Sequence, residues 1–453
     1  MRNPDLLITH AKVITMDKER RVLLDGGLAI HEGQILEVGN SKALQARYPN
    51  PKETIDASGK LALPGLINTH THIAMALFRG LYAGDPSSIY AIMFPIEENL
   101  EAEDVYHLGL LGAVECLKGG ATTIVDHYYF MDAIARAVEI VGLRGVLGHT
   151  IADRLAAFTG KHEKVRALRF LREWRNRTPR IIPALAPHSP ETVSIETLSE
   201  LRRISDKENV LLHIHLAQSP QEIEYIRQTH GVTPVELLDR IGFLGSDVLA
   251  AHCVFVGDAD IDRLASHQVS VVFCPTSQVS YLHSNVTPVP ELLAKGVNVA
   301  LGTDTAAGTG NMNILEELRI ASTVQLFRSG DQGRLSPQKL LEMVTLDAAN
   351  AIQLGEHIGS LEPGKRADLL LIDLQKAELA PINDLYMTAI FGITAPNLDT
   401  ILIDGQVVLS RGTVVGVDEG ELIRDASMAR TEGLSRAMKR HPHLSRSLMW
   451  LED

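Results

Sequence analysis

The chain contains a series of short apolar runs that end on histidine or aspartate. Segments with apolar residues at helical spacing separate these runs, giving about eight strand and helix pairs between residues 64 and 354. Strands joined by such crossovers are parallel, and eight of them close a barrel. We therefore predict an α/β fold, a (β/α)8 TIM barrel. The polar ends of the runs are His70 and His72, Asp126, His149, His188, His215, His252 and Asp304.

These polar ends also predict where the function lies. Barrel enzymes place their chemistry at the C-terminal ends of the strands. Histidines scattered at random through a fold would not fall at so many equivalent strand ends. We therefore expect these side chains to meet at one face of the barrel.

His70 and His72 predict a metal site. Side chains on a strand alternate between its two faces, so two histidines separated by one residue point the same way and can bind one ion. Adding His215 and Asp304 gives three imidazoles and one carboxylate. This set suits one divalent ion, zinc by preference and ferrous iron as the alternative, with a position left for water.

The predicted ion indicates hydrolytic chemistry. A divalent metal acidifies its water towards neutrality, which supplies a nucleophile at physiological pH. Asp304 can take the proton of that water. His252, at the end of its own strand, is expected to polarise or hydrogen-bond the electrophilic end of a substrate.

The two ends of the chain have a different pattern, with short β-runs and Asp-Gly or Glu-Gly turn signals. We predict that residues 1–63, as an antiparallel sheet, join residues 355–417 in one small β-sandwich domain, beside a catalytic barrel of residues 64–354. Residues 337–351 read as one helix that covers the barrel. Residues 418–453 are predicted to be a C-terminal helical tail, lying on the surface or on a neighbouring subunit of a homodimer or homotetramer.

Composition narrows the partners and the compartment. The net charge is −13, and no basic stripe accompanies aromatic residues, which argues against nucleic-acid polymers. No run of ~20 apolar residues predicts a membrane span, and the N-terminus lacks the apolar core of a secretory signal. The three cysteines are widely spaced, as expected of reduced core residues. We expect a cytoplasmic protein that acts on a small heterocyclic molecule.

Several motifs together resemble the amidohydrolase superfamily, in its cytosine-deaminase-like branch. The group that they resemble most is the methylthioadenosine/S-adenosylhomocysteine deaminases. The resemblance implies a barrel with a β-sandwich, one divalent metal, and hydrolysis at a ring carbon that releases ammonia or another leaving group. The motifs are Pro64-Gly-Leu-Ile-Asn-Thr-His-Thr-His72, Pro95-Ile-Glu97, Ala186-Pro-His-Ser-Pro190, His213-Ile-His-Leu216, Ala250-Ala-His-Cys-Val254, Leu301-Gly-Thr-Asp304 and Gly359-Ser-Leu-Glu-Pro-Gly-Lys-Arg-Ala-Asp368.

The resemblance also implies substrate contacts and exposes two departures. In that group the residue matching Glu97 binds ribose hydroxyls, and the residue matching His188 reaches the purine. A glutamate that shuttles protons is replaced here by Gln218, and an arginine is replaced by His149. We therefore expect Gln218 in the catalytic set, and Glu97, His188 and His149 as substrate-binding residues. An amide can exchange hydrogen bonds but cannot relay a proton as a carboxylate does.

Three functional hypotheses follow. The leading one is an aminohydrolase of a purine nucleoside such as methylthioadenosine or S-adenosylhomocysteine. The second keeps the metal but releases chloride, an alkylamine or a thiol from a triazine-type ring, since Gln218 favours a leaving group that needs less protonation. The third is a metal-binding protein without turnover, and the intact ligand set argues against it.

Overall fold

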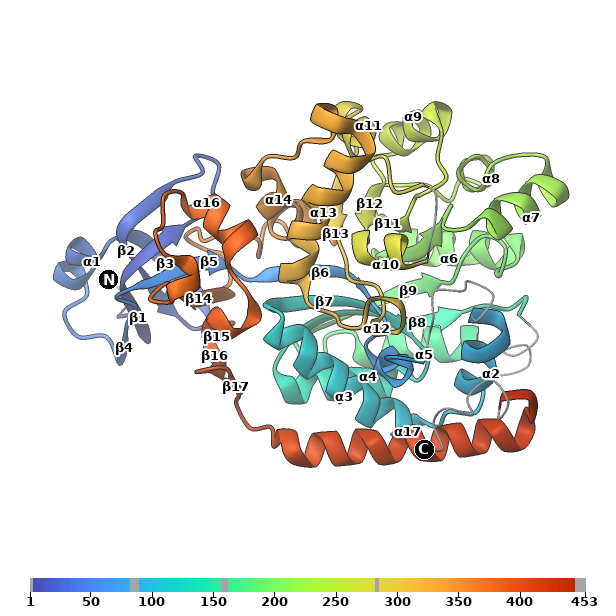
Figure 1. Ribbon diagram of the computed structural model, residues 1–453, viewed down its shortest axis with the longest axis horizontal. Helices are drawn as coiled ribbons and strands as arrows, with labels where there is room; N and C mark the ends of the chain where they lie inside the picture. Colours follow the sequence, from blue (N-terminus) through green and yellow to red (C-terminus); the bar gives the residue numbers. More distant parts are fainter. Residues whose placement is uncertain (1–2, 82–88, 156–161, 282–284, 445–453) are drawn as a thin grey trace.

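The computed structural model describes residues 3–81, 89–155, 162–281 and 285–444, and two sheets organise this part of the chain (Figure 1). One sheet has eight strands, all parallel, hydrogen-bonded in the order of the sequence. The predicted barrel is confirmed. Its strands are β6 (Leu66–Thr71), β7 (Ala121–Tyr128), β8 (Arg144–Ile151), β9 (Ile181–Pro187), β10 (Leu212–Leu216), β11 (Val248–His252), β12 (Ser270–Phe273) and β13 (Asn298–Leu301).

The barrel closes between the end of β6 and the residues just past β13. Thr71 and Asp304 form a parallel bridge. The amide of Asp304 donates to the carbonyl of His70 (2.9 Å), and the amide of His72 donates to the carbonyl of Asp304 (3.2 Å). A Cβ on Gly302 would lie only 2.8 Å from the Cβ of His70, so glycine permits this close approach. Closure therefore brings Asp304 beside both histidines.

Helices surround the barrel and cover its C-terminal end (Figure 1). Those that follow the strands are α3 (Ala102–Lys118), α4 (Met131–Val141), α5 (Glu163–Trp174), α6 (Ile195–Glu208), α7 (Pro220–His230), α8 (Pro234–Arg240), α9 (Asp258–Ser266), α11 (Val289–Ala294) and α13 (Ile314–Ser329). Shorter pieces at strand ends and in connections are η1 (Ile73–Phe78), η2 (Ile89–Met93), α2 (Phe94–Glu97), α10 (Pro275–Ser280), α12 (Ala306–Thr309), η3 (Gly330–Gly333), η4 (Ala377–Leu379), α16 (Leu385–Met387), η5 (Thr388–Gly392) and η6 (Ala395–Asn397).

The single helix predicted over residues 337–351 is wrong. The structure has two helices there, α14 (Pro337–Met343) and α15 (Leu346–Ala351). The carbonyl of Val344 accepts the amide of Ile67 on β6 (2.8 Å), and the hydroxyl of Thr345 donates to the carbonyl of Leu341 (2.6 Å). The carbonyl of Val344 therefore bonds to the first barrel strand instead of to a further turn of helix, and the helix ends at Met343.

The second sheet joins the two ends of the chain. Its path runs β17-β16-β15-β14-β5-β1-β2-β3, and β4 pairs with β1. The link between the ends is the antiparallel pair β5 and β14. The strands are β1 (Leu6–Ile14), β2 (Val22–His31), β3 (Gln34–Asn40), β4 (Glu53–Asp56), β5 (Lys60–Pro64), β14 (Leu369–Asp373), β15 (Leu398–Ile403), β16 (Gln406–Ser410) and β17 (Thr413–Val414).

The N-terminal part of this sheet is mixed, so the antiparallel sheet predicted for residues 1–63 is wrong in part. The hairpin of β2 and β3 is antiparallel as predicted, with Glu32 and Gly33 at positive φ in its turn. Helix α1 (Ser41–Arg47) then connects β3 to β4. Strands β4 and β5 both pair with β1 in parallel. A crossover of this kind is what parallel pairing requires.

Helix α17 (Glu419–Arg440) runs beneath α3 in the view of Figure 1. Its apolar side is buried at Leu422, Ala426 and Leu434. The helix therefore lies on the surface of the barrel helices, one of the two placements predicted for the tail. Residues 445–453 of that tail lie outside the described residues. No helix in the described ranges is long and apolar enough to cross a membrane.

Candidate metal centre and substrate pocket

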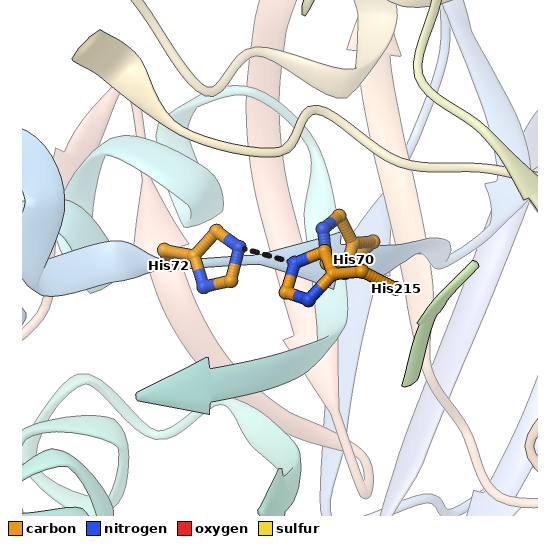
Figure 2. Close-up of side chains that lie close together, drawn as sticks. All are labelled: His70, His72 and His215. Atoms are coloured by element: carbon orange, nitrogen blue, oxygen red, sulfur yellow. Dashed lines mark hydrogen bonds between the residues drawn. The ribbon is translucent and has the colours of Figure 1, made fainter. Parts of the chain in front are cut away.

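Three of the four predicted metal ligands converge in Figure 2, and the fourth lies beside them. His70 and His72 stand at the end of β6 and His215 on β10, with Nε2 of His72 3.2 Å from Nε2 of His215. Oδ1 of Asp304, just past β13, is 3.4 Å from Nε2 of His72 and 3.7 Å from Nε2 of His70. All four side chains are buried.

Contacts behind the ligands fix which atoms face one another. Nδ1 of His72 donates to the carbonyl of His127, and Nδ1 of His215 donates to the carbonyl of His188 (2.8 Å). Each bond places the ring proton on Nδ1 and leaves the electron pair of Nε2 free, which is the usual arrangement in a metal-ligating histidine.

The remaining two ligands are held by side chains. Nδ1 of His70 lies 2.8 Å from Nε2 of His213, and the hydroxyl of Ser277 donates to Oδ2 of Asp304 (2.5 Å). The contact with Ser277 leaves Oδ1 of Asp304 as the oxygen that faces the histidines.

The donor set fits a divalent ion. Nε2 of His70 is buried and has no hydrogen-bond partner in the described part of the chain, although buried polar atoms are normally paired. Burial lowers the pKa of His70 and of His215 well below the usual range, so both rings are neutral and can offer electron pairs. Ligand atoms of His70, His72 and His215 lie within 4.8 Å of one another, as do those of His70, His252 and Asp304. A cation among them would pair the atom that is otherwise unsatisfied.

His252 ends β11 and packs against the same centre. Its ring is stacked on that of His215, with centroids 5.4 Å apart and planes at 11°. The backbone of His252, like that of Asp304 and Ala217, has positive φ. Such strained conformations are found where a strand end must aim a side chain, as at active sites. His252 therefore lies beside the predicted ligand His215 and lines the pocket described next.

A pocket opens over this centre. Its wall includes carboxyl, imidazole, amide and phenol groups together with apolar side chains. The lining residues are His72, Met75, Met93, Phe94, Glu97, His127, Tyr128, Tyr129, Thr150, His188, His215, Gln218, Ser219, Gln221, His252, Val254, Ser277, Gln278, Tyr281, Asp304 and Thr305. An apolar pocket with a few convergent polar groups is the usual form of a small-molecule site.

Glu97 and His188, both predicted as substrate-binding residues, line this pocket. Burial raises the pKa of Glu97 to about 7, so its carboxyl is close to half protonated at neutral pH. Burial lowers the pKa of His188 to about 3, which keeps that ring neutral. Nδ1 of His188 contacts the hydroxyls of Ser189 (3.0 Å) and Thr192 (2.8 Å).

Gln218 also lines the pocket, and a buried carboxyl holds its backbone. The amides of Gln218 and Ala217 donate to the two oxygens of Glu222, at 2.7 and 2.9 Å. Burial, reinforced by the charge of Glu191, raises the pKa of Glu222 well above its usual range. The turn after β10 is therefore fixed by Glu222, and the side chain of Gln218 is presented to the pocket.

His149 lies elsewhere, and the substrate contact predicted for it does not fit this placement. Its Nε2 is 2.5 Å from Oε2 of Glu163 on α5, and its Nδ1 accepts the amide of Met131 (3.4 Å). Side chains alternate along a strand, so the next residue of β8, Thr150, lines the pocket instead. The sequence identified the strand end but not which of two adjacent side chains faces inward.

Other pocket residues were not predicted. His127 and Tyr128 were missed because the strand was expected to end at Asp126, whereas β7 continues to Tyr128. The sequence did contain a signal for them, because His127 directly follows Asp126, one of the polar strand ends. Ser277 follows β12, at the start of α10, and no pattern in the sequence tied it to Asp304.

Comparisons with known proteins agree with this geometry. The profile of the amidohydrolase family matches residues 61–408. A 5'-deoxyadenosine deaminase of Methanosarcina acetivorans is 37% identical, and the match covers 96% of this chain and 99% of that protein. A 5-methylthioadenosine/S-adenosylhomocysteine deaminase of Pelotomaculum thermopropionicum is 36% identical, with 93% and 97% covered.

A solved structure matches as well. A zinc-bound adenosine deaminase of Xanthomonas campestris is 28% identical and superposes with a TM-score of 0.91, over 96% of this chain and 99% of that one. These matches span the barrel and the second sheet together. As its motifs predicted, the chain belongs to the amidohydrolase family.

Proposed function

We propose that this amidohydrolase deaminates a 5'-substituted adenosine, such as 5'-deoxyadenosine or methylthioadenosine, with one zinc ion. The observation that carries the proposal is the convergence of His70, His72, His215 and Asp304 beneath a pocket that also contains His252 and Glu97. The relatives named above as deaminases of such nucleosides support the choice of substrate.

The reaction exchanges an amine for an oxygen. Water adds to the ring carbon, the carbon–nitrogen bond breaks, and the products are ammonia and the oxo nucleoside. The four ligands would hold a divalent ion, which would supply an acidified water and polarise the reacting group. The carboxylate of Asp304, held at Oδ2 by Ser277, takes a proton from the attacking water. The imidazole of His252 orients the electrophilic end of the substrate beside His215.

The remaining groups bind the nucleoside. The carboxyl of Glu97, buried in the pocket wall, accepts hydrogen bonds from sugar hydroxyls. The amide of Gln218 exchanges hydrogen bonds with the heterocycle, and the apolar wall of Met75, Met93 and Phe94 excludes water from it.

The test measures product release and metal together. We expect ammonia from 5'-deoxyadenosine and methylthioadenosine, and about one zinc per chain by elemental analysis. His215→Ala should lose both the metal and turnover, because it removes one of the four ligands. His10→Ala is the matched control, since that histidine is exposed on the second sheet. Full activity without stoichiometric metal would refute the proposal.

A second candidate remains because of Gln218. An amide cannot relay a proton, which favours leaving groups such as chloride or thiolate on a triazine-type ring. Assaying chloride and thiol release in the same screen separates this function from deamination, and release of none of these products would favour a protein without turnover. A homodimer or homotetramer of this chain, and its cytoplasmic location, stay predictions.

A further inference from the structure

His127 is a pocket residue that the reaction described above does not use. It lies near the end of β7, its side chain is 1% exposed, and it lines the pocket. Neither of its ring nitrogens has a hydrogen-bond partner among the residues that the structure describes, and both nitrogens are buried. Among the described pocket residues it is the one histidine for which both nitrogens lack a partner.

Leaving such a ring unpaired is costly. A buried polar atom without a partner has lost its hydrogen bonds to water and gained none in return, and most buried polar atoms are therefore paired with protein, water or ligand. Neutral or protonated, an imidazole ring carries at least one N–H group, so His127 can donate a hydrogen bond to a bound molecule.

The surroundings fix this ring in place. Its centroid is 4.8 Å from that of His215 and 6.0 Å from that of His188, and its carbonyl accepts Nδ1 of His72. His127 and His252 both pack against His215, but β7 and β11 lie on opposite sides of β10 in the strand order. Both side chains line the pocket, so a heterocycle bound beside His252 would share that pocket with His127.

We propose that His127 is a further substrate-binding residue, which donates a hydrogen bond to a bare ring nitrogen of the bound purine and selects heterocycles that carry one there. This inference rests on the proposed function, because it takes a purine nucleoside as the substrate. It gives one of the two orphan nitrogens a partner that is present only when the substrate is bound. It assigns His127 a role in recognition, with the metal ligands unchanged.

The test removes the hydrogen bond from either side. His127→Leu and His127→Gln are compared with the native protein on 5'-deoxyadenosine and on its 3-deaza and 7-deaza analogues, each of which lacks one ring nitrogen. We expect His127→Leu to raise KM for the parent about 10- to 100-fold, the penalty of one lost hydrogen bond in a buried site. For the analogue without the contacted nitrogen, native protein and variant should have similar KM. His127→Gln, which keeps a donor, should recover part of the loss.

Two measurements complete the test. Metal content should be unchanged in both variants, and equilibrium binding of the unreactive oxo nucleoside should weaken in His127→Leu by the same factor as KM rises. His149→Gln is the control, because it removes a buried imidazole outside the pocket and should change all three substrates alike. An equal penalty on all substrates, no penalty on the parent, or loss of metal in both variants would overturn the inference. Absence of ammonia release by the native protein would instead refute the proposed function.

Discussion

Gln218 joins the pocket to a buried carboxyl four residues further along the chain. The backbone N–H of Gln218 donates to Oε2 of Glu222, and the pKa of Glu222 is raised by burial and by Glu191. The side chain of Gln218 lines the pocket, so position 218 offers a bound heterocycle both N–H donors and a carbonyl acceptor. A carboxylate at the same position would offer acceptors alone.

The first prediction concerns Gln218→Glu. We expect KM for an adenosine-type substrate to rise about 10-fold, because the new carboxylate lacks the N–H donors of the amide and loses a substrate contact; this corresponds to about 1.4 kcal/mol. Metal content should not change. Gln221→Glu, which adds the same charge at another pocket residue, is the control and should have a smaller effect. A rise in kcat of roughly 10²–10⁴-fold would show instead that a proton shuttle was missing.

The packing of helix α3 supports the candidate metal centre. Helix α3 packs directly on η1, the short helix that begins just after His72. A Cβ on Gly112 of α3 would lie 2.2 Å from the carbonyl oxygen of Ile73, the first residue of η1. Glycine in a helix normally costs about 1 kcal/mol relative to alanine, so this position must give something in return. It allows α3 to hold η1, and with it His72, against the barrel.

The second prediction is that Gly112→Ala destabilises the protein despite its better helix propensity. Overpacking of this kind costs about 1–3 kcal/mol, and displacement of η1 should also weaken metal retention during dialysis against a chelator. Denaturant midpoints and metal content measure the two effects. Gly420→Ala on α17 is the control, because its nearest atoms are the flexible ends of Asp418 and Arg424. An unchanged midpoint for Gly112→Ala would contradict the argument.

Prediction from the sequence succeeded where a local pattern determines structure. Alternating strands and helices gave the barrel, and the polar strand ends identified His70, His72, His215 and Asp304, which the structure brings together. Errors arose where the structure depends on contacts between residues that are far apart in the sequence. The break before Thr345 depends on a bond to Ile67, and the inward side chain on β8 depends on register. Ser277 meets Asp304 only because the strands that precede them, β12 and β13, pair side by side.

At the scale of the whole molecule, an ion network joins the barrel to the second sheet. Asp404 lies in the turn between β15 and β16 and pairs with Arg144 (2.9 Å), Arg180 (2.8 Å) and Arg366. Arg144 also pairs with Asp368 (3.0 Å). Arg144 begins β8, so the network lies at the N-terminal end of the barrel, the end that contributes to stability rather than chemistry.

The final prediction tests this network through pH. The three arginines hold the pKa of Asp404 down at about 2, below its ordinary 3.8. A lowered pKa in the folded state contributes stability that is complete above the unfolded value, and it is lost as the pH falls from about 4 through about 2. The shift corresponds to roughly 2 kcal/mol.

Asp404→Asn should therefore lower the free energy of unfolding by about 2–4 kcal/mol at pH 7, because it also leaves buried arginine charge less well paired. Urea unfolding of both proteins between pH 7 and pH 2 measures the difference, which should shrink as the pH falls below 4. Asp331→Asn is the control, since that carboxylate is 90% exposed and its pair with Arg334 should contribute little at any pH. A difference between native protein and Asp404→Asn that stays constant down to pH 2 would show that Asp404 acts through packing and not through its charge.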